Sequence, residues 1–321
     1  MQIHKLPPGD ESRYDALAHA HGTVFHTLAW TNLFDGRLQR YGLYDEGGDL
    51  VGGFVLYHDR RFGGRLYCNP PFTPEVGPFL RVTASNPVKV AETWKTALAR
   101  VCELVDSLPY AVVSISLHKH VVDLQPFVWK HFKVVPGYTY VLDLSVPLDE
   151  IWAGMSNERR KNIKKARRDG VRVEPAQPLA RVEELARATF ARQGVKIAED
   201  VLRRVLFDFA DEENSFAFVA YRDTRPVAAA FCVCDQTAAY YLFGGHEPDG
   251  GHTGAGALCL WEAISEAKRR GLLYFDFEGS MNPNIERFFR GFGGRLTPYF
   301  RANKARLPLE MVLKFFNRSL F

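Results

Sequence analysis

The sequence lacks the features that would place it outside ordinary globular proteins. Among its 321 residues there are only five cysteines, without a Cys-x-x-Cys pair, and the ten histidines show no zinc-ligand spacing. No segment reaches the run of about 18 apolar residues that a spanning helix needs, and the first ten residues have no apolar signal-peptide core. We therefore expect a cytoplasmic protein without a metal ion, in solution or at the inner face of the membrane.

Charge is nearly balanced overall but unevenly placed. Forty-one Lys and Arg against 37 Asp and Glu give a formal charge of +4. The segment 156–170 alone carries +5, from seven basic and two acidic residues, so the rest of the chain sums to −1. The protein is not generally basic, and this one segment points to a polyanionic partner.

The predicted elements follow the same order in two halves of the chain. In the first half, periodicity and turn residues predict, in order, an amphipathic helix, a buried strand, a short aromatic helix and a closing strand, over residues 87–108, 111–117, 126–132 and 138–144. In the second half the same series falls on residues 257–270, 272–278, 283–292 and 295–301. Local matches such as Trp94 with Trp261 support a duplication. We predict an α/β (α+β) protein of two tandem domains, residues 1–147 and 148–321, each a mixed twisted sheet flanked by helices.

A glycine-rich loop over residues 244–257 precedes the long helix of the second half. Glycines allow backbone N–H groups to approach a ligand, and a helix N-terminus favours an anionic phosphate. A surface loop without a ligand would have the same composition. The loop is therefore a candidate donor site, with Gly254 and Gly256 as its binding residues.

The predicted strand 272–278 carries two acids near its C-terminal end. By strand alternation Asp276 and Glu278 share one face. A carboxylate in such a place can deprotonate an incoming ammonium group, whereas an ion pair with Arg287, Arg290 or Arg295 would give Asp276 a purely structural role. We assign catalysis to Glu278 first and to Asp276 second.

The segment that follows carries a recognisable pattern. Asn282, Phe289 and Gly293 match the Asn-x6-Tyr-x3-Gly helix that closes many GNAT acyltransferase domains. With the glycine loop and the Asp-Phe-Glu-Gly strand, residues 150–300 resemble the second domain of FemABX-like proteins, which join two GNAT-type domains in one chain. The resemblance implies an N-acyltransferase that uses acyl-CoA or aminoacyl-tRNA as co-substrate, holds no cofactor tightly and modifies an amine, such as a bacterial cell-envelope or lipid precursor. It also implies donor contacts at Asn282 and Phe289.

Two departures from the family pattern bear on the donor. Phe289 stands where many GNAT enzymes have a Tyr as general acid, so the leaving group would take its proton from water or substrate. The pyrophosphate loop is matched only by residues 251–256, without its first Gln or Arg. This mismatch favours aminoacyl-tRNA, while the lack of the long coiled-coil arm of some tRNA-using relatives removes part of that support.

The basic segment also resembles the stretch that opens the second domain of FemABX-like proteins. We predict a helix capped by Ser156 and ended by Gly170, with Arg160, Lys164 and Lys165 holding phosphate. The alternative is a non-catalytic GNAT-like module that binds RNA or an anionic membrane through the basic helix 157–169, and a solvated basic face without a partner is also open.

An acceptor cleft is implied by the same resemblance. We assign His26, Trp30 and Tyr241 to it, although the sequence favours a packed, hydrogen-bonded His26 over one that orients a substrate. The apolar terminal stretch 307–321 either packs on the core or lies on a membrane surface beside a lipid-linked substrate.

Overall fold

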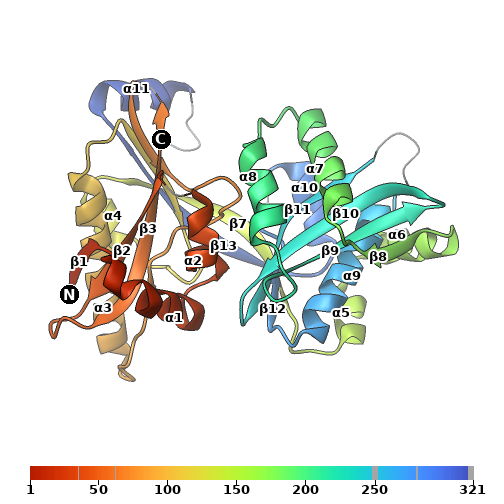
Figure 1. Ribbon diagram of the computed structural model, residues 1–321, viewed down its shortest axis with the longest axis horizontal. Coiled ribbons are helices and arrows are strands. Elements are labelled where there is room, and N and C mark those ends of the chain that lie inside the picture. Colours follow the sequence, from red (N-terminus) through yellow and green to blue (C-terminus); the bar gives the residue numbers. More distant parts are fainter. Residues whose placement is uncertain (35, 62, 248–251, 280, 317–321) are drawn as a thin grey trace. The chain divides into compact units, whose positions relative to one another are not determined.

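The computed structural model describes residues 1–34, 36–61, 63–247, 252–279 and 281–316. The chain forms two compact units (Figure 1). Unit 1 contains Met1–Gly137 and Pro298–Phe321, and unit 2 contains Tyr138–Thr297. The α/β class predicted from the sequence is confirmed, because each unit has a mixed sheet flanked by helices.

Unit 1 has the strand order β1-β2-β3-β4-β6-β13, and β5 pairs with β3. The bounds of these strands are β1 Gln2–Lys5, β2 Leu38–Tyr44, β3 Leu50–Arg61, β4 Gly64–Cys68, β5 Phe79–Leu80, β6 Val112–Leu117 and β13 Arg295–Ala305. Along this order every pair is antiparallel except β4 with β6. The main helices of the unit are α1 Glu11–His21, α2 Leu28–Thr31, α3 Pro87–Ser107, α4 Gln125–Trp129 and α11 Leu307–Phe316.

Unit 2 has the strand order β8-β9-β10-β11-β12-β7. The bounds are β7 Lys133–Asp143, β8 Arg172–Pro175, β9 Ser215–Arg222, β10 Arg225–Cys234, β11 Ala238–His246 and β12 Tyr274–Asp276. Here too every pair is antiparallel except one, β11 with β12. The helices are α5 Leu148–Gly154, α6 Asn157–Arg168, α7 Ala180–Arg192, α8 Glu199–Arg204, α9 Ala255–Arg269 and α10 Pro283–Arg290, and Val205–Phe209 is a π-helical turn.

The two units repeat one topology. In each, three antiparallel pairs lead to a parallel pair whose connection contains a long helix, α3 or α9, and then to one more antiparallel strand. That last strand is exchanged, because β7 follows α4 in the chain but pairs with β12, and β13 follows α10 but pairs with β6. The exchange explains why the compact units differ from the predicted division at residue 147, since both β7 and β13 run through a unit boundary.

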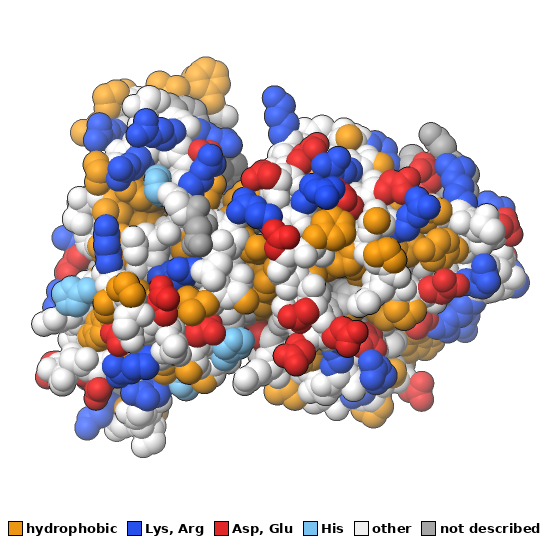
Figure 2. Space-filling model, viewed as in Figure 1, with side chains coloured by type: hydrophobic (Ala, Val, Ile, Leu, Met, Phe, Trp, Pro, Cys, Tyr) orange, Lys and Arg blue, Asp and Glu red, His pale blue; other side chains and the backbone are white. Residues whose placement is uncertain are grey.

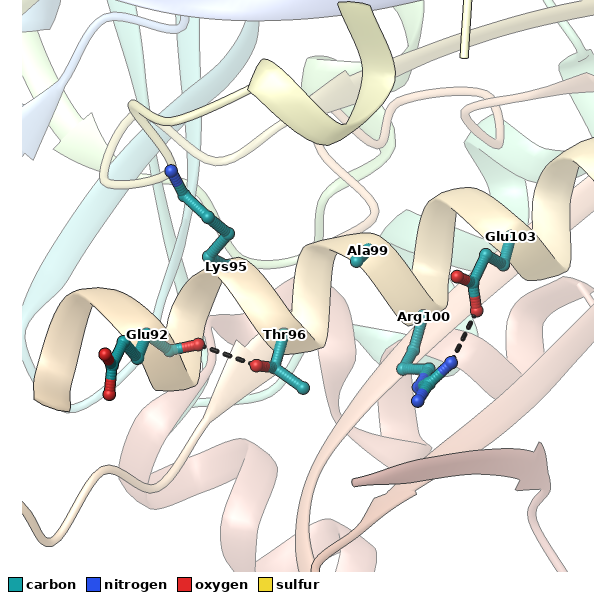
Figure 3. Close-up of a pocket in the computed structure, with 6 residues that line it drawn as sticks. All are labelled: Glu92, Lys95, Thr96, Ala99, Arg100 and Glu103. Carbon is teal, nitrogen blue, oxygen red and sulfur yellow. Dashed lines mark hydrogen bonds and ion pairs between the residues drawn. The ribbon is translucent and has the colours of Figure 1, made fainter. Parts of the chain in front are cut away.

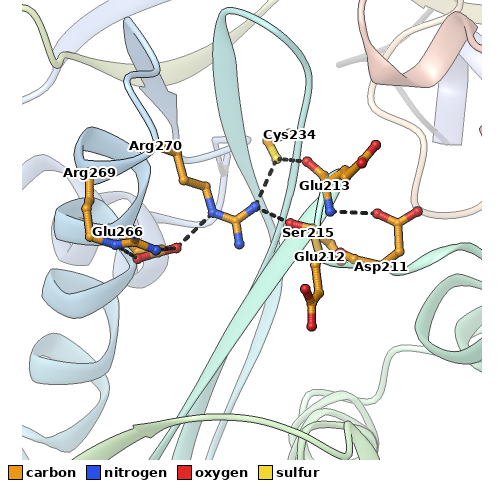
Figure 4. Close-up of polar contacts among 8 residues, drawn as sticks. All are labelled: Asp211, Glu212, Glu213, Ser215, Cys234, Glu266, Arg269 and Arg270. Carbon is orange, nitrogen blue, oxygen red and sulfur yellow. Dashed lines mark hydrogen bonds and ion pairs between the residues drawn. The ribbon is translucent and has the colours of Figure 1, made fainter.

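Local contacts fix one end of each long helix. Asn86 accepts hydrogen bonds from the first backbone N–H groups of α3. At the C-terminal end of α9, Arg270 donates to the Glu266 carboxylate at 2.8 Å and to the Glu212 carbonyl at 2.9 Å (Figure 4). Its guanidinium also lies 4.7 Å from the Phe216 ring centroid. These contacts tie the C-terminal end of α9 to the start of β9.

The structure corrects the predicted strand 272–278. Strand β12 ends at Asp276, because Glu278 and Gly279 both have a φ of 55°. A left-handed residue cannot continue a strand, so the alternation that placed Asp276 and Glu278 on one face is interrupted. The other predicted strands and helices are present with bounds shifted by a few residues.

Candidate functional site

Strand β11 of unit 2 carries a bulge. In its register with β10, Phe231 faces Phe243 and Cys232 faces Tyr241, which leaves Leu242 as the extra residue. On its other side, β11 pairs with β12 only through its first three residues, Ala238–Tyr240. Beyond that point the two parallel strands part, and within the described residues no strand pairs with this side of the bulge. A bulge beside a parting of strands exposes backbone N–H groups that can bind a carbonyl oxygen.

The N-terminus of α9 contains both glycines predicted to bind a donor, and they have different surroundings. Gly254 is the N-cap, and a Cβ added there would overlap the Asn162 carbonyl of α6 and lie 3.1 Å from the Ala166 Cβ. The Gly254 N–H donates to His252 Nδ1 at 3.0 Å. A Cβ at Gly256 would meet nothing within 4 Å. Gly254 therefore permits close packing of the two helices, whereas Gly256 lies beside open space at a helix N-terminus, where an anion is favoured.

The rest of the predicted pyrophosphate loop, residues 248–251, lies outside the described residues. His252, at its end, is buried and bridges to the basic helix. Its Nε2 lies 3.0 Å from the Asp169 carboxylate, which also accepts from Lys165 Nζ at 2.5 Å. The hydrogen bonds from Lys165 and then His252 hold the pKa of Asp169 well below its usual range. This cluster was missed from the sequence, because His252 and Asp169 are far apart along the chain.

The basic helix α6 is present as predicted, with Ser156 accepting from the Arg159 N–H at 3.2 Å and Gly170 following it in a left-handed conformation with φ of 79°. Most of its charge has partners within unit 2. Arg159 is buried with its guanidinium 4.2 Å from the Phe288 ring centroid, and burial lowers its pKa. Arg167 pairs with Glu262 at 2.9 Å.

The three residues predicted to bind phosphate are not equivalent. Arg160 donates to the carbonyl of Ala153, at the end of α5, at 3.1 Å and to the Asn157 side chain. Lys165 is held by Asp169. Lys164 is exposed and, like Lys161, has no partner among the described residues. Among the residues that the structure describes, Lys161 and Lys164 are therefore the two basic side chains of α6 without a protein partner.

The two predicted catalytic acids have different roles in the structure. Asp276 is buried and accepts from the Thr139 hydroxyl at 2.5 Å and from the Glu278 N–H at 2.9 Å. It thereby holds the left-handed turn that presents Glu278, which is half-buried just beyond the strand end. Asp276 is a positioning residue, and Glu278 is the better candidate for proton transfer. Nothing in the sequence marked Thr139 as its partner.

Asn282 and Phe289, which we predicted to contact the donor, have structural roles in α10. Asn282 is its N-cap and accepts from the Asn284 N–H at 3.0 Å. Phe289 is buried in an aromatic cluster, where its ring centroid lies 5.8 Å from that of Tyr241 and 5.4 Å from that of Phe277. Tyr241, the residue before the bulge, brings a phenol to this cluster, and burial raises its pKa. Tyr241 of β11 is therefore a hydroxyl-bearing side chain in contact with Phe289.

The two acceptor residues predicted in the first half are internal. Trp30 has no exposed surface and donates from Nε1 to the Thr73 hydroxyl at 3.0 Å. His26 is 1% exposed, with Nδ1 accepting from the Thr23 N–H at 3.1 Å, and burial lowers its pKa to about 4. Both side chains have packing roles within unit 1, so their assignment to an acceptor cleft gains no support.

Two hollows in the structure lie apart from these residues. One of about 310 Å³ lies on the surface of α3, beside Lys95 and Arg100 (Figure 3). The other, of about 450 Å³, lies in unit 2 between β7, β12 and α5, with Asp143, Glu150 and Arg295 among its lining residues. The described residues contain no group of three or more His, Cys, Asp or Glu side chains suited to a metal ion.

Comparisons with known proteins agree with this fold. Residues 155–290 match the family model of the acetyltransferase (GNAT) domain. No curated protein matches the sequence. The crystal structure of FemX is similar at 12% identity with a TM-score of 0.67, over 98% of this chain and 100% of that one. The C-terminal domain of a protein described as a lysylphosphatidylglycerol synthetase from Agrobacterium fabrum is also 12% identical, with a TM-score of 0.58 over 95% of each chain. L-PGS from Bacillus licheniformis has a TM-score of 0.55 at 12% identity, over 99% of this chain and 98% of that one.

Proposed function

We propose that the chain is an N-acyltransferase, because residues 155–290 match the GNAT domain model and the fold is similar to that of FemX. It transfers an acyl or aminoacyl group from an activated donor to the amine of an acceptor such as a cell-envelope or lipid precursor. The observation that carries the proposal is the β11 bulge at Leu242, on a strand that packs against α9, whose N-terminus has open space at Gly256. This combination can bind a carbonyl oxygen and an anionic tail of one donor.

Each step of the transfer has a candidate group in unit 2. Glu278 takes a proton from the acceptor ammonium, and the free amine attacks the donor carbonyl. Backbone N–H groups at the bulge stabilise the oxyanion that forms. As the carbonyl is restored, the bond to the leaving group breaks. The attacking nitrogen then loses its second proton, and the protonated Tyr241 hydroxyl can relay it to the leaving group, giving one proton and taking the other.

Acyl-CoA is the donor that the geometry supports better. A tRNA needs many phosphate contacts, whereas α6 offers only Lys161 and Lys164 free of protein partners among the described residues. A single pyrophosphate can be held by one helix N-terminus. Aminoacyl-tRNA remains the second candidate, because the loop before α9 lacks the Gln or Arg that starts the usual pyrophosphate motif.

The pairing of most basic side chains of α6 within the protein also argues against the alternative, a non-catalytic binding module. A helix that binds RNA or a membrane through its charge should present that charge to solvent. Arg159 is instead buried on Phe288, and Lys165 and Arg167 are paired with Asp169 and Glu262.

Thermal unfolding with candidate ligands separates these functions. A donor at 100 times its Kd stabilises the folded state by about 2.7 kcal/mol. We expect acyl-CoA to raise the Tm, and Gly256→Ala to reduce that shift. A Tm shift with aminoacyl-tRNA but not with acyl-CoA would show that the donor is aminoacyl-tRNA. If no donor shifts the Tm, and RNA binds saturably but no longer binds Lys161→Gln/Lys164→Gln, the proposed transferase function would be refuted.

A further inference from the structure

Helix α11 of unit 1 has two apolar faces, and only one of them is covered. Leu309 and Leu313 are partly buried against Val112 and Ala305, at the ends of β6 and β13. The other face is exposed to solvent over nearly the whole helix. Its apolar residues and their exposed fractions are Leu307 79%, Met311 72%, Val312 50%, Phe315 69% and Phe316 80%. Large apolar side chains gathered in this way on one short helix mark an interaction surface.

Arginines lie at the same end of the unit 1 sheet. Arg60 faces Arg65 across the β3–β4 pair, and Arg61 faces Gly64. Strand β4 continues beside β6 with Leu66 opposite Val112, and Val112 faces Ala305 of β13. Arg306 follows Ala305 directly and leads into α11. We call Arg60, Arg61, Arg65 and Arg306 the arginine rim.

Few carboxylates neutralise the arginine rim. Asp59 pairs with Arg61 at 3.4 Å, and Glu310 pairs with Lys314 of α11 at 2.6 Å. Arg60, Arg65 and Arg306 form no ion pair with any residue that the structure describes. Figure 2 shows hydrophobic side chains gathered where Figure 1 places α11, with Lys and Arg side chains beside them.

We propose that α11 and the arginine rim form a docking surface for an anionic lipid bilayer. An interfacial helix buries one apolar face at the boundary of head groups and acyl chains, and nearby cations add attraction to anionic lipids. In this proposal α11 lies on the bilayer surface. No helix among the described residues is both long and apolar enough to cross a bilayer. A second copy of the chain fits less well, since it would bring two arginine rims together. This inference does not depend on the proposed transfer activity.

Vesicle co-sedimentation of the full chain tests the proposal directly. We expect binding to vesicles of phosphatidylcholine with 30% phosphatidylglycerol, and at least tenfold weaker binding to phosphatidylcholine alone or in about 0.5 M salt. Phe315→Ser/Phe316→Ser should weaken binding by at least about tenfold, because the two rings supply much of the inserted area. Arg60→Gln/Arg65→Gln should weaken it by about fivefold for each charge removed.

A matched control removes exposed apolar residues elsewhere in the same unit. Val88 and Val122 are 65% and 71% exposed, and Val88→Ser/Val122→Ser should leave vesicle binding unchanged. Circular dichroism and the Tm of each variant show that the fold is kept. Equal binding to neutral and anionic vesicles, or no loss in Phe315→Ser/Phe316→Ser, would overturn the proposal. So would a concentration-dependent dimer, seen by light scattering, that the same variant abolishes.

Discussion

Gly254 and Gly256 provide a matched pair of substitutions that separates packing from donor binding. They lie two residues apart at the N-terminus of α9, and both were assigned to the donor on composition. The structure gives them opposite surroundings. Gly254 faces the backbone of α6, and Gly256 faces open space. The same Ala substitution should therefore have opposite effects on stability.

Gly254→Ala should destabilise the protein. The added methyl group would overlap the Asn162 carbonyl and crowd the Ala166 Cβ at 3.1 Å, and backbone atoms cannot rotate away. Overpacking of this kind costs about 1–3 kcal/mol. For a unit of this size each kcal/mol lowers the Tm by roughly 2–4 °C.

Gly256→Ala should be neutral or stabilising, because Ala is favoured over Gly in a helix by about 0.5–1 kcal/mol. If an acyl-CoA tail lies against this glycine, however, the methyl group should lower donor affinity. Urea unfolding of both variants gives the stabilities, and the donor-induced Tm shift gives the binding. Equal stability of the two variants would refute the packing argument. An unchanged donor shift in Gly256→Ala would remove Gly256 from the donor site.

Four further predictions concern the chemistry and the pH dependence. Glu278→Gln should lower kcat by about 10²–10⁴-fold with little change in Tm, and full turnover would exclude it as the base. Asp276→Asn weakens the acceptor of the Thr139 hydroxyl and the Glu278 N–H, so we expect a loss of about 1.5–3 kcal/mol of stability by urea unfolding together with reduced kcat. Tyr241→Phe should reduce kcat without changing the donor-induced Tm shift, and an unchanged kcat would exclude it as the proton donor. Burial lowers the His26 pKa to about 4, so the unfolded chain binds the proton more readily and stability falls as pH drops from about 6.5 towards 4. The loss should reach about 2 kcal/mol at pH 5 by urea unfolding, and a pH slope that His26→Gln leaves intact would assign it to another group.

Most helices and strands could be predicted from residue patterns within single segments of the chain. Helix α3 was predicted over 87–108 and found over Pro87–Ser107, because its apolar stripe is a local signal. The exchange of β7 and β13 could not be predicted in this way. The sequences of β7 and β13 both predict a strand at the end of a series. The strand with which each one pairs is decided by packing between segments that are far apart in the chain.

The contacts within the predicted site could not be predicted from the sequence, for the same reason. Strand alternation placed Glu278 beside Asp276, but a Glu with positive φ has no signature in the sequence, and the turn depends on a carboxylate fixed by Thr139. A charge count identified α6, yet it could not show that Arg159 is buried or that Asp169 holds Lys165. Local sequence indicates where charge lies, and only the folded chain shows which charge is left for a ligand.

The duplicated topology offers an internal comparison that supports the proposed donor site in unit 2. In unit 1 the strand that corresponds to β11 is β4, and its register with β3 runs from Tyr57 opposite Cys68 to Arg61 opposite Gly64 without a shift. The helix that corresponds to α9 is α3, whose first N–H groups donate to the Asn86 side chain. In unit 2 the register does shift, at Leu242, and the N-cap Gly254 has no side chain to occupy the helix N-terminus. Among the described residues, the two features that we propose to bind the donor, a strand bulge and a helix N-cap without a side chain, are thus present in unit 2, whereas unit 1 has regular pairing and a side-chain cap in their place. A donor that stabilises this protein should therefore protect the backbone amides of β11 and α9 from hydrogen exchange and leave those of β4 and α3 unchanged. Equal protection in both units would contradict the assignment.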